Sequence, residues 1–593
     1  MKRLLPVLLL FVFAATSLGQ SPTVKITISP ETTYETQCKL PDGRIDYFAA
    51  INKPFQSSVA KDNNIVAGLF SLTVGEAEMS LIKAKAKGDP ASENEHLVKY
   101  RQRFWKMLGD EQPPELDSLV CPYPYGGADI KQQLIADYGE KELAEMLEAG
   151  RQGERDYCKT RFEEKKMSEE EYQEEIRRIN EGKSDMHIYH NIGQEEWYEA
   201  LSKKWTEKNY PRLAKWIAST DDLTQKLIAI SKRTEYYHPY LSYNENDKLL
   251  FQYMLPYAQG MRETARFFQM RSNWEFVNGR FDQAMECAFS AVRLGQTMRK
   301  GSGCIVEDLV GVAMIGIGNF QITKYLVDPD LKQEAGWFLK KQKEYDAIYT
   351  QIGPFPVPPF WPNSERLSVL SAIQLMAYEP KSIIDFYRED GYDEESVAKF
   401  DKLFNSGIEY DWDEILRQTN TLYDELEDIS ALPSMKRQLR ASKRLEKRIA
   451  DEFEQSKTNT ALTPEQQAVL YIREYYFCSV NAMLNATTRA IWERRITHVA
   501  FSLAAYRADH GGANPDSLDQ LVPKYLESVP LSPFTDEPLR YVKRENDCLI
   551  ASDNAYKLDG TETKLEEMIA EAPAGERRYP DQEHFIFIVG KGK

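Results

Sequence analysis

The sequence predicts a mainly α protein: a body of repeat-like helical hairpins followed by a small C-terminal α+β module. Two observations lead to this class. Apolar residues recur mostly every three or four positions from residue 63 to about residue 510, which is the period of α-helices with one buried face. Beyond that point glycine and proline become frequent and short β-rich runs follow, which are typical of turns and strands.

The first twenty residues are typical of a secretory signal peptide. Lys2 and Arg3 precede an apolar run from Leu4 to Ala15, and Ser17 and Gly19 then form a small-x-small cleavage site. This order is shared by export signals, and the run is shorter than the roughly 20 residues that span a bilayer. We therefore expect residues 1–19 to be cleaved and the mature chain, which would have no membrane span, to be exported as a periplasmic or secreted protein.

The chain is acidic, and its apolar content is high enough to bury a large core. It has 593 residues, of which 42% are hydrophobic and 28% charged, and its formal charge is −17. Such acidity favours solubility and argues against nucleic acid as a partner, because binding nucleic acid requires clustered cations. The seven cysteines lack the spacing of zinc or redox motifs. Cys287 and Cys304 could form a disulfide or remain two core thiols.

Composition and turn signals divide the chain into six segments. They are a signal peptide (1–19), an extended N-terminal segment (20–62), a helical domain (63–352), a proline-rich connection (353–362), a second helical part (363–462), and a long helix with an α+β module (463–593). Four prolines of the connection fall within six residues, and each removes a backbone donor, so we expect no helix there.

Several helix starts follow from capping signals. Asp62 is placed to cap the first helix of the body. Ser168 with Glu171 forms a capping-box pattern, and Thr463 with Gln466 forms a second one. The first box opens a highly charged helix, which we interpret as solvent-exposed, and the second opens a long helix that could extend to residue 509. Residues 436–448 are locally basic, which indicates a solvated or helix-pairing face.

The region from Met254 to Leu326 has the strongest helix-hairpin pattern. Gly279 marks a turn, and three alanines follow at helical spacing, which resembles part of a tetratricopeptide repeat. No second copy follows at the roughly 34-residue period, so we expect repeat-like hairpins rather than a tetratricopeptide array. The apolar run from Leu309 to Gly318 is too short to span a membrane and predicts a buried central helix, whose glycines allow close packing.

The last 100 residues carry a family resemblance. A helix from Ile496 to His510 stops at two glycines, and a Pro-x-aromatic turn follows. Three expected strands come next, at Leu539–Val542, Cys548–Ala551 and His584–Val589. This order of elements is similar to the globular domain of type II secretion major pseudopilins. The resemblance implies a small antiparallel sheet packed beside a long helix.

Major pseudopilins also bind calcium in the loop before their last strand. The acidic loop from Asp553 to Asp559 lies in a comparable place, so the resemblance implies Asp553 and Asp559 as calcium ligands. Two carboxylates supply few of the six to eight oxygens that calcium takes, and we expect no other cofactor. Charged residues, including Glu493 and Arg494, replace the apolar half of the pseudopilin helix, which argues against a pilus subunit.

As a whole the chain resembles a group of large uncharacterised exported bacterial proteins with a helical middle and this kind of tail. Three segments carry that resemblance: Asp42–Tyr47, Tyr210–Trp216 and Asp411–Leu416. The resemblance implies no known activity.

We find no catalytic motif. The chain lacks a GxSxG elbow, and His187 and His190 are three apart without a metalloprotease frame. The tyrosine-rich run from Tyr236 to Tyr243 is interpreted as helix packing, with sugar stacking as the alternative. We therefore expect a non-enzymatic helical scaffold or binding protein with a protein partner in the bacterial envelope. The alternative is a hydrolase acting on envelope polysaccharide or peptide through carboxylates in a helical cleft.

Overall fold

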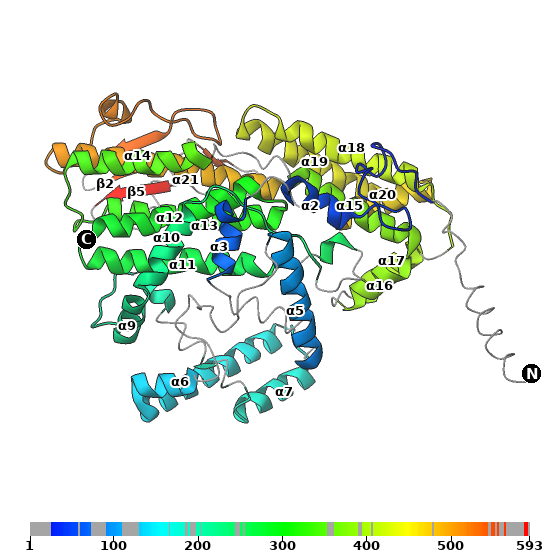
Figure 1. The fold of residues 1–593 in the computed structure, drawn as a ribbon, viewed down its shortest axis with the longest axis horizontal. Coiled ribbons are helices and arrows are strands. Elements are labelled where there is room, and N and C mark those ends of the chain that lie inside the picture. The colour runs from blue at the N-terminus through cyan, green and yellow to red at the C-terminus, as the bar shows by residue number, and fades with distance from the viewer. Residues whose placement is uncertain are drawn as a thin grey trace, which may run out of the picture.

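The computed structural model describes residues 25–590, with gaps. The gaps are residues 57–59, 73–89, 110–129, 165, 184, 186–187, 190–196, 202, 243–248, 253–254, 353–360, 390–393, 405–406, 460, 477–479, 544–546, 552–553, 557–561 and 565–585. Within the described residues the chain is mainly helical, as the sequence predicts, and its strands follow residue 539 (Figure 1).

The helices of the N-terminal half are α2 (Tyr47–Gln56), α3 (Ile65–Phe70), α5 (Pro90–Met107), α6 (Ile130–Glu163), α7 (Glu169–Asn180), α9 (Pro211–Ser219), α10 (Asp221–Ser231), α11 (Pro256–Val277) and α12 (Phe281–Gly301). The later helices are α13 (Ile305–Leu326), α14 (Ala335–Ile352), α15 (Trp361–Tyr378), α16 (Pro380–Glu389), α17 (Glu394–Phe404), α18 (Trp412–Ser430), α19 (Met435–Ser456), α20 (Pro464–Tyr476) and α21 (Val480–Asp509). Short 3-10 turns are η1 (Lys61–Asn63), η3 (Leu250–Gln252) and η4 (Leu518–Leu521).

The centre of the molecule is a group of long helices. α13 packs against α11, α12 and α21, and α14 packs against α12 and α21. Figure 1 shows α11, α12, α14 and α21 running side by side. The turn between α11 and α12 lies at Gly279, whose φ of +74° is readily adopted by glycine, as the hairpin pattern predicts. Because α21 belongs to the C-terminal segment, that segment shares the core of the helical body.

α13 is the buried central helix that its apolar run predicts. Among the described residues it is the one helix long and apolar enough to span a membrane, and 56% of its most apolar window is buried inside the structure. A Cβ atom added to Gly311 would lie 2.8 Å from the carbonyl oxygen of Gly295 on α12. The glycines therefore allow two helix backbones to approach each other closely, as the sequence predicts.

A second group of helices lies beside this centre. α15 contacts α2, α16 and α18, while α19 and α20 contact each other and α18. Residues on one face of α18 are buried, including Trp412, Ile415, Leu416, Thr419 and Leu422.

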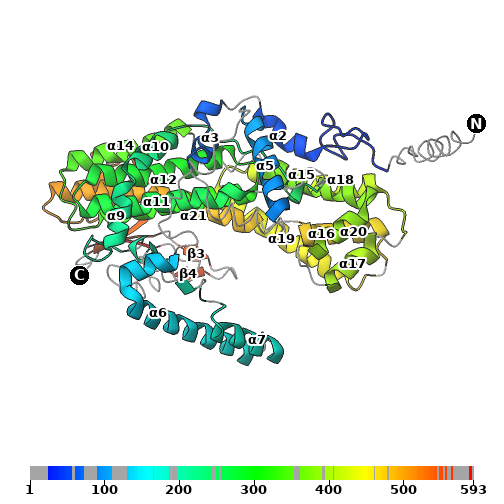
Figure 2. The same cartoon turned by 60° about the horizontal axis from the view of Figure 1, so that its bottom comes forward.

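The charged hairpin of α6 and α7 lies away from both groups (Figure 2). Its predicted capping box is present: the Glu171 N–H donates to Ser168 Oγ at 3.3 Å, and the Ser168 N–H donates to Glu171 Oε2 at 2.8 Å. The second predicted box also forms, because the Thr463 N–H donates to Gln466 Oε1 at 3.0 Å. The structure therefore confirms the two helix starts that the capping patterns predict.

The C-terminal strands are β1 (Arg540–Lys543), β2 (Asp547–Ala551), β3 (Asn554–Tyr556), β4 (Glu562–Lys564) and β5 (Ile586–Gly590). They form a three-stranded antiparallel sheet of order β1-β2-β5 and a separate β3-β4 pair. Tyr541 pairs with Ile550, and Leu549 pairs with Ile588. The expected strands coincide with β1, β2 and β5 within two residues.

Three local expectations differ from the structure. The segment expected to be extended contains α2, because Tyr47, Ala50 and Ile51 gain burial there at 3 to 5% exposure. Asn64, rather than Asp62, caps α3, since Asn64 Oδ1 accepts from the Val66 N–H at 3.0 Å. Helix α15 starts inside the proline-rich connection, where Pro362 is tolerated in the first turn.

No disulfide joins the cysteines of the described residues. Cys38, Cys158, Cys287, Cys304 and Cys548 keep their thiols, while Cys121 and Cys478 lie outside the described residues. The possible disulfide between Cys287 and Cys304 is therefore absent. Both side chains are instead 1% exposed core residues.

Candidate ligand-binding pocket

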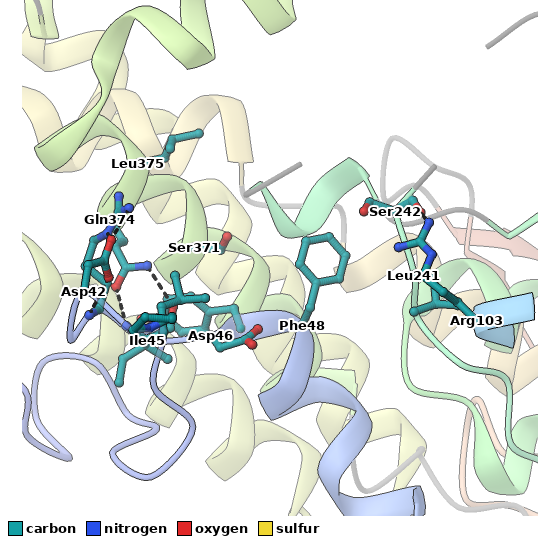
Figure 3. Close-up of a pocket in the computed structure, with 14 residues that line it drawn as sticks. Asp42, Ile45, Asp46, Phe48, Arg103, Leu241, Ser242, Ser371, Gln374 and Leu375 are labelled. Atoms are coloured by element: carbon teal, nitrogen blue, oxygen red, sulfur yellow. Dashed lines mark hydrogen bonds and ion pairs between the residues drawn. The ribbon is translucent and has the colours of Figure 1, made fainter. Parts of the chain in front are cut away.

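A cavity of about 490 Å³ lies where the N-terminal segment meets α15 (Figure 3). Its volume falls in the range of sites that hold small molecules or a few side chains. Four parts of the chain line it: residues 40–48, one face of α15, the pair Leu241 and Ser242, and Arg103 of α5. The first of these parts contains Asp42–Tyr47, one of the segments that carry the whole-chain resemblance.

A tight turn forms the first wall. The Leu40 N–H donates to the Arg44 carbonyl at 2.8 Å, and Gly43 between them has a φ of +88°, which favours glycine. A side-chain hydrogen bond also stabilises the turn, because Asp42 Oδ2 accepts from Arg44 Nε at 2.8 Å.

Arg44 fastens the turn to the end of α15. Its Nη1 donates to Glu379 Oε1 at 2.7 Å, and its guanidinium lies 5.4 Å from the centre of the Tyr378 ring. Burial alone would lower the pKa of Arg44, but hydrogen bonds to Asp42 and Glu379 outweigh burial and raise this pKa. Arg44 is thus a fixed cation whose charge is balanced by two carboxylates.

The polar side chains of α15 also hold the wall together. Gln374 Oε1 accepts from the Ile45 N–H at 3.0 Å, and Gln374 Nε2 donates to the Ile45 carbonyl at 3.0 Å. Ser371 Oγ accepts from the Leu250 N–H at 3.0 Å. These bonds satisfy backbone groups that would otherwise be unpaired beside a cavity.

Asp46 is the carboxylate best placed to meet a ligand. Its Oδ1 accepts from the Ala49 N–H at 2.9 Å, which caps α2. Within the described part of the chain, no hydrogen bond or ion pair involves its other oxygen. Figure 3 shows Asp46 and Phe48 in the middle of the pocket, between Gln374 and Arg103.

The far wall combines a guanidinium with apolar side chains. Arg103 Nη2 donates to the Ser242 carbonyl at 2.9 Å, which ties α5 to the tyrosine-rich run. Phe48, Leu241 and Leu375 supply apolar surface to the same cavity. A ligand in this pocket would therefore meet the Asp46 carboxylate, the guanidinium groups of Arg44 and Arg103, and an apolar wall.

The tyrosine-rich run packs inside the protein. Tyr236, Tyr237 and Tyr240 are 1 to 3% exposed, and the hydroxyls of Tyr236 and Tyr240 both donate to Glu307 at the start of α13. This finding favours the packing interpretation over sugar stacking, because none of these rings presents a face to solvent.

The candidate calcium ligands and the two histidines fall on residues that the structure does not describe. Asp553, Asp559, His187 and His190 all lie outside the described residues. Among the residues that the structure describes, no group of three or more His, Cys, Asp or Glu side chains could hold a metal ion. The sequence does not predict this pocket, although the Asp42–Tyr47 segment that lines it carries part of the whole-chain resemblance.

His238, next to the pocket wall, gives a prediction about pH. Its ring is buried, 5.1 Å from the Phe104 ring centre, and burial lowers its pKa well below the ordinary 6.5. The unfolded chain takes up a proton near its ordinary pKa while the folded chain does not, so acidification favours unfolding. Between pH 7 and pH 5 we expect His238 to reduce the unfolding free energy by up to about 2 kcal/mol.

Urea titrations at both pH values check this prediction. The variant His238→Phe keeps an aromatic ring but cannot take a proton, so it should lose less stability on acidification than the wild type. An identical loss in both proteins would contradict the prediction.

No protein-family model matches the chain, and searches of curated proteins and of solved structures gave no match. The resemblance of the last 100 residues to major pseudopilins therefore stays a prediction.

Proposed function

We propose that this protein is an exported, non-enzymatic helical binding protein, and that its pocket receives a short segment of a protein partner in the bacterial envelope. The signal-like residues 1–19 support export. The observation that carries the binding proposal is the pocket's Asp46, whose carboxylate has one oxygen engaged by the fold and faces an apolar wall.

The chemistry of the pocket suggests the kind of segment that fits. Phe48, Leu241 and Leu375 would cover an apolar side chain, and burying such a side chain contributes about 1.5–3 kcal/mol. Asp46 would accept a hydrogen bond from a neighbouring lysine or arginine of the partner, and a charged hydrogen bond contributes about 1.5–3 kcal/mol. We therefore propose a segment with an apolar residue next to a cation.

Binding is a better proposal than hydrolysis because the second carboxylate of the pocket is already occupied. A carboxylate hydrolase needs two acids acting on one bond. Here Asp42 is held by Arg44 through Nε and Nη2, at 2.8 and 2.5 Å.

We also propose that the C-terminal module is pseudopilin-like, supported by the long helix α21 followed by the antiparallel order β1-β2-β5.

A random heptapeptide library selected on the immobilised protein tests the proposal. We expect enrichment of peptides with an apolar residue beside lysine or arginine. Asp46→Asn should weaken binding of an enriched peptide about tenfold, which corresponds to the loss of about 1.4 kcal/mol. The fold should be kept, because asparagine also caps helices. Phe48→Ala should weaken the same peptide by a comparable factor.

The matched control is Asp222→Asn, which removes an exposed carboxylate paired with Lys226 on α10, remote from the pocket lining. It should leave peptide affinity unchanged. Failure to enrich any peptide, or equal affinity of the Asp46→Asn variant and the wild type, would contradict the proposal. Cleavage of enriched peptides by the wild type but not by Asp46→Asn would favour the hydrolase alternative.

A further inference from the structure

Helix α13 presents an apolar face to solvent along its first half. Val306 is 51% exposed and Leu309 is 38% exposed, and Ala313, one turn further on, is exposed as well. Val310, which lies between the last two, is partly exposed. These residues follow one another at spacings of three and four, so they lie on one side of the helix. We call them the apolar row of α13.

The apolar row lies between two neighbouring helices. Gln321 Nε2 of α13 donates to Asn273 Oδ1 of α11 at 2.7 Å, which places α11 on one side. A Cβ atom added to Gly316 of α13 would lie 3.5 Å from Glu493 Oε2 of α21, which places α21 on the other side. At about 100° per residue, the row falls between these two directions around α13. A third helix could therefore pack on the row.

A guanidinium borders the row on the side of α11. Arg262 precedes Asn273 by eleven residues, about three helical turns, so both lie on the same face of α11. α11 and α13 are each joined to α12 by a short turn and therefore run parallel, which brings Arg262 to the level of Val310. The buried Nε of Arg262 has no hydrogen-bond partner among the described residues. A buried donor of this kind favours an acceptor beside the row.

Residues 565–585, which connect β4 to β5 and lie outside the described residues, contain a sequence that matches the row. We call residues 565–572 the amphipathic segment, because their apolar positions follow the helical period: Leu565, Met568, Ile569 and Ala572. Pro573 comes directly after them and favours a helix end there. A helix this short is marginal in water by itself, so it needs a partner for its apolar side.

The connection that holds the amphipathic segment is tied to elements near α21. Ile550 of β2 pairs with Phe587 of β5. Ile550 also shares a buried cluster with Ile496 and Phe501 of α21. Figure 2 shows β3 and β4 below α21 and α11. Each residue after the segment can span about 3.3 Å, so the connection is long enough for the segment to reach the row.

The charges of the amphipathic segment match those beside the row. On a helix, Glu566 and Glu571 would flank the apolar side of the segment from opposite directions. Arg262 borders the row on α11. Arg489 of α21 lies one turn before Glu493 and on the same face. A helix on the row would therefore bring one carboxylate toward each guanidinium.

We propose that the amphipathic segment packs as a helix on the apolar row of α13, between α11 and α21, with its two flanking glutamates pairing with Arg262 and Arg489. The tether to β4 favours this segment over a second copy or a separate protein, because it raises the effective concentration of the segment. α13 contributes no residue to the lining of the pocket near Asp46, so the inference does not depend on the proposed function.

Disulfide trapping in the full chain tests the proposal. Oxidation of the variant Ala313→Cys with Met568→Cys should join the two positions within one chain. The control Ala313→Cys with Glu567→Cys places its second thiol on the opposite side of the segment, so it should cross-link about tenfold more slowly. Peptide mapping without reductant separates these links from bonds to native cysteines. No link at position 568, equal rates for the two pairs, or a link that joins two chains would overturn the proposal.

Trypsin cleavage after Arg577 gives a second measurement. Leu309→Asp puts a charge on the row and should release the segment, so we expect cleavage to become about tenfold faster. Circular dichroism should show an unchanged helix content, because Leu309 is exposed. The matched control Ile408→Asp puts the same charge on another apolar side chain, which is 46% exposed, and should leave the cleavage rate unchanged. Equal acceleration in both variants, or none in Leu309→Asp, would contradict the proposal.

Discussion

Replacing Arg299 by methionine is expected to lower the unfolding free energy by about 3–5 kcal/mol, because it leaves a buried carboxylate without its cation. Arg299 Nε on α12 donates to Asp308 Oδ1 on α13 at 2.8 Å, and both side chains are 0% exposed. Arg299 Nη2 also donates to Thr487 Oγ1 on α21 at 3.2 Å. One guanidinium thus joins three helices of the central group.

Urea unfolding followed by circular dichroism measures this effect. The paired variant Arg299→Met with Asp308→Leu removes both charges and should regain much of the stability lost in the single variant, because an apolar pair of similar volume avoids the unpaired charge. A loss below about 1 kcal/mol in the single variant would contradict the prediction. A double variant as unstable as the single one would show that Arg299 acts through Thr487 rather than through Asp308.

Much of the helical architecture follows from local chemistry. The capping boxes at Ser168 and Thr463 mark true helix starts because their hydrogen bonds lie within four residues of sequence. The buried helix α13 is visible as an apolar run, and the strands β1 and β2 as short β-rich segments after a turn. These features depend on neighbours along the chain, which a sequence displays directly.

The expectations that failed depend on distant residues. Helix α2 forms in a stretch without a strong helical pattern because Asp46 caps it and Tyr47 gains burial, and tertiary contacts override such weak local preferences. The pocket could not be predicted for the same reason, since its walls come from residues 40–48, Arg103, Leu241 with Ser242, and α15. The cationic run of α19 is visible in the sequence, but only the fold shows which of its cations point outward and which pair with residues of other helices.

The second large effect on the free energy of unfolding is expected where α12 and α13 cross. A Cβ atom added to Gly311 would lie 2.5 Å from Arg299 Cγ and 2.8 Å from the Gly295 carbonyl oxygen. Backbone atoms cannot move away without separating the two helices, so Gly311→Ala should lower the unfolding free energy by about 1–3 kcal/mol despite the better helix propensity of alanine.

Gly316→Ala on the same helix provides the matched control. The nearest atom to its added Cβ would be Glu493 Oε2 at 3.5 Å, an ordinary contact. This variant gains helix propensity without a clash and should be neutral or more stable by up to about 1 kcal/mol. Urea unfolding of the two variants should therefore give changes of opposite sign or, at the least, a clear loss for Gly311→Ala alone. Equal changes in both would mean that close approach of the backbones does not set the spacing of α12 and α13, and that the glycines of α13 act through helix propensity.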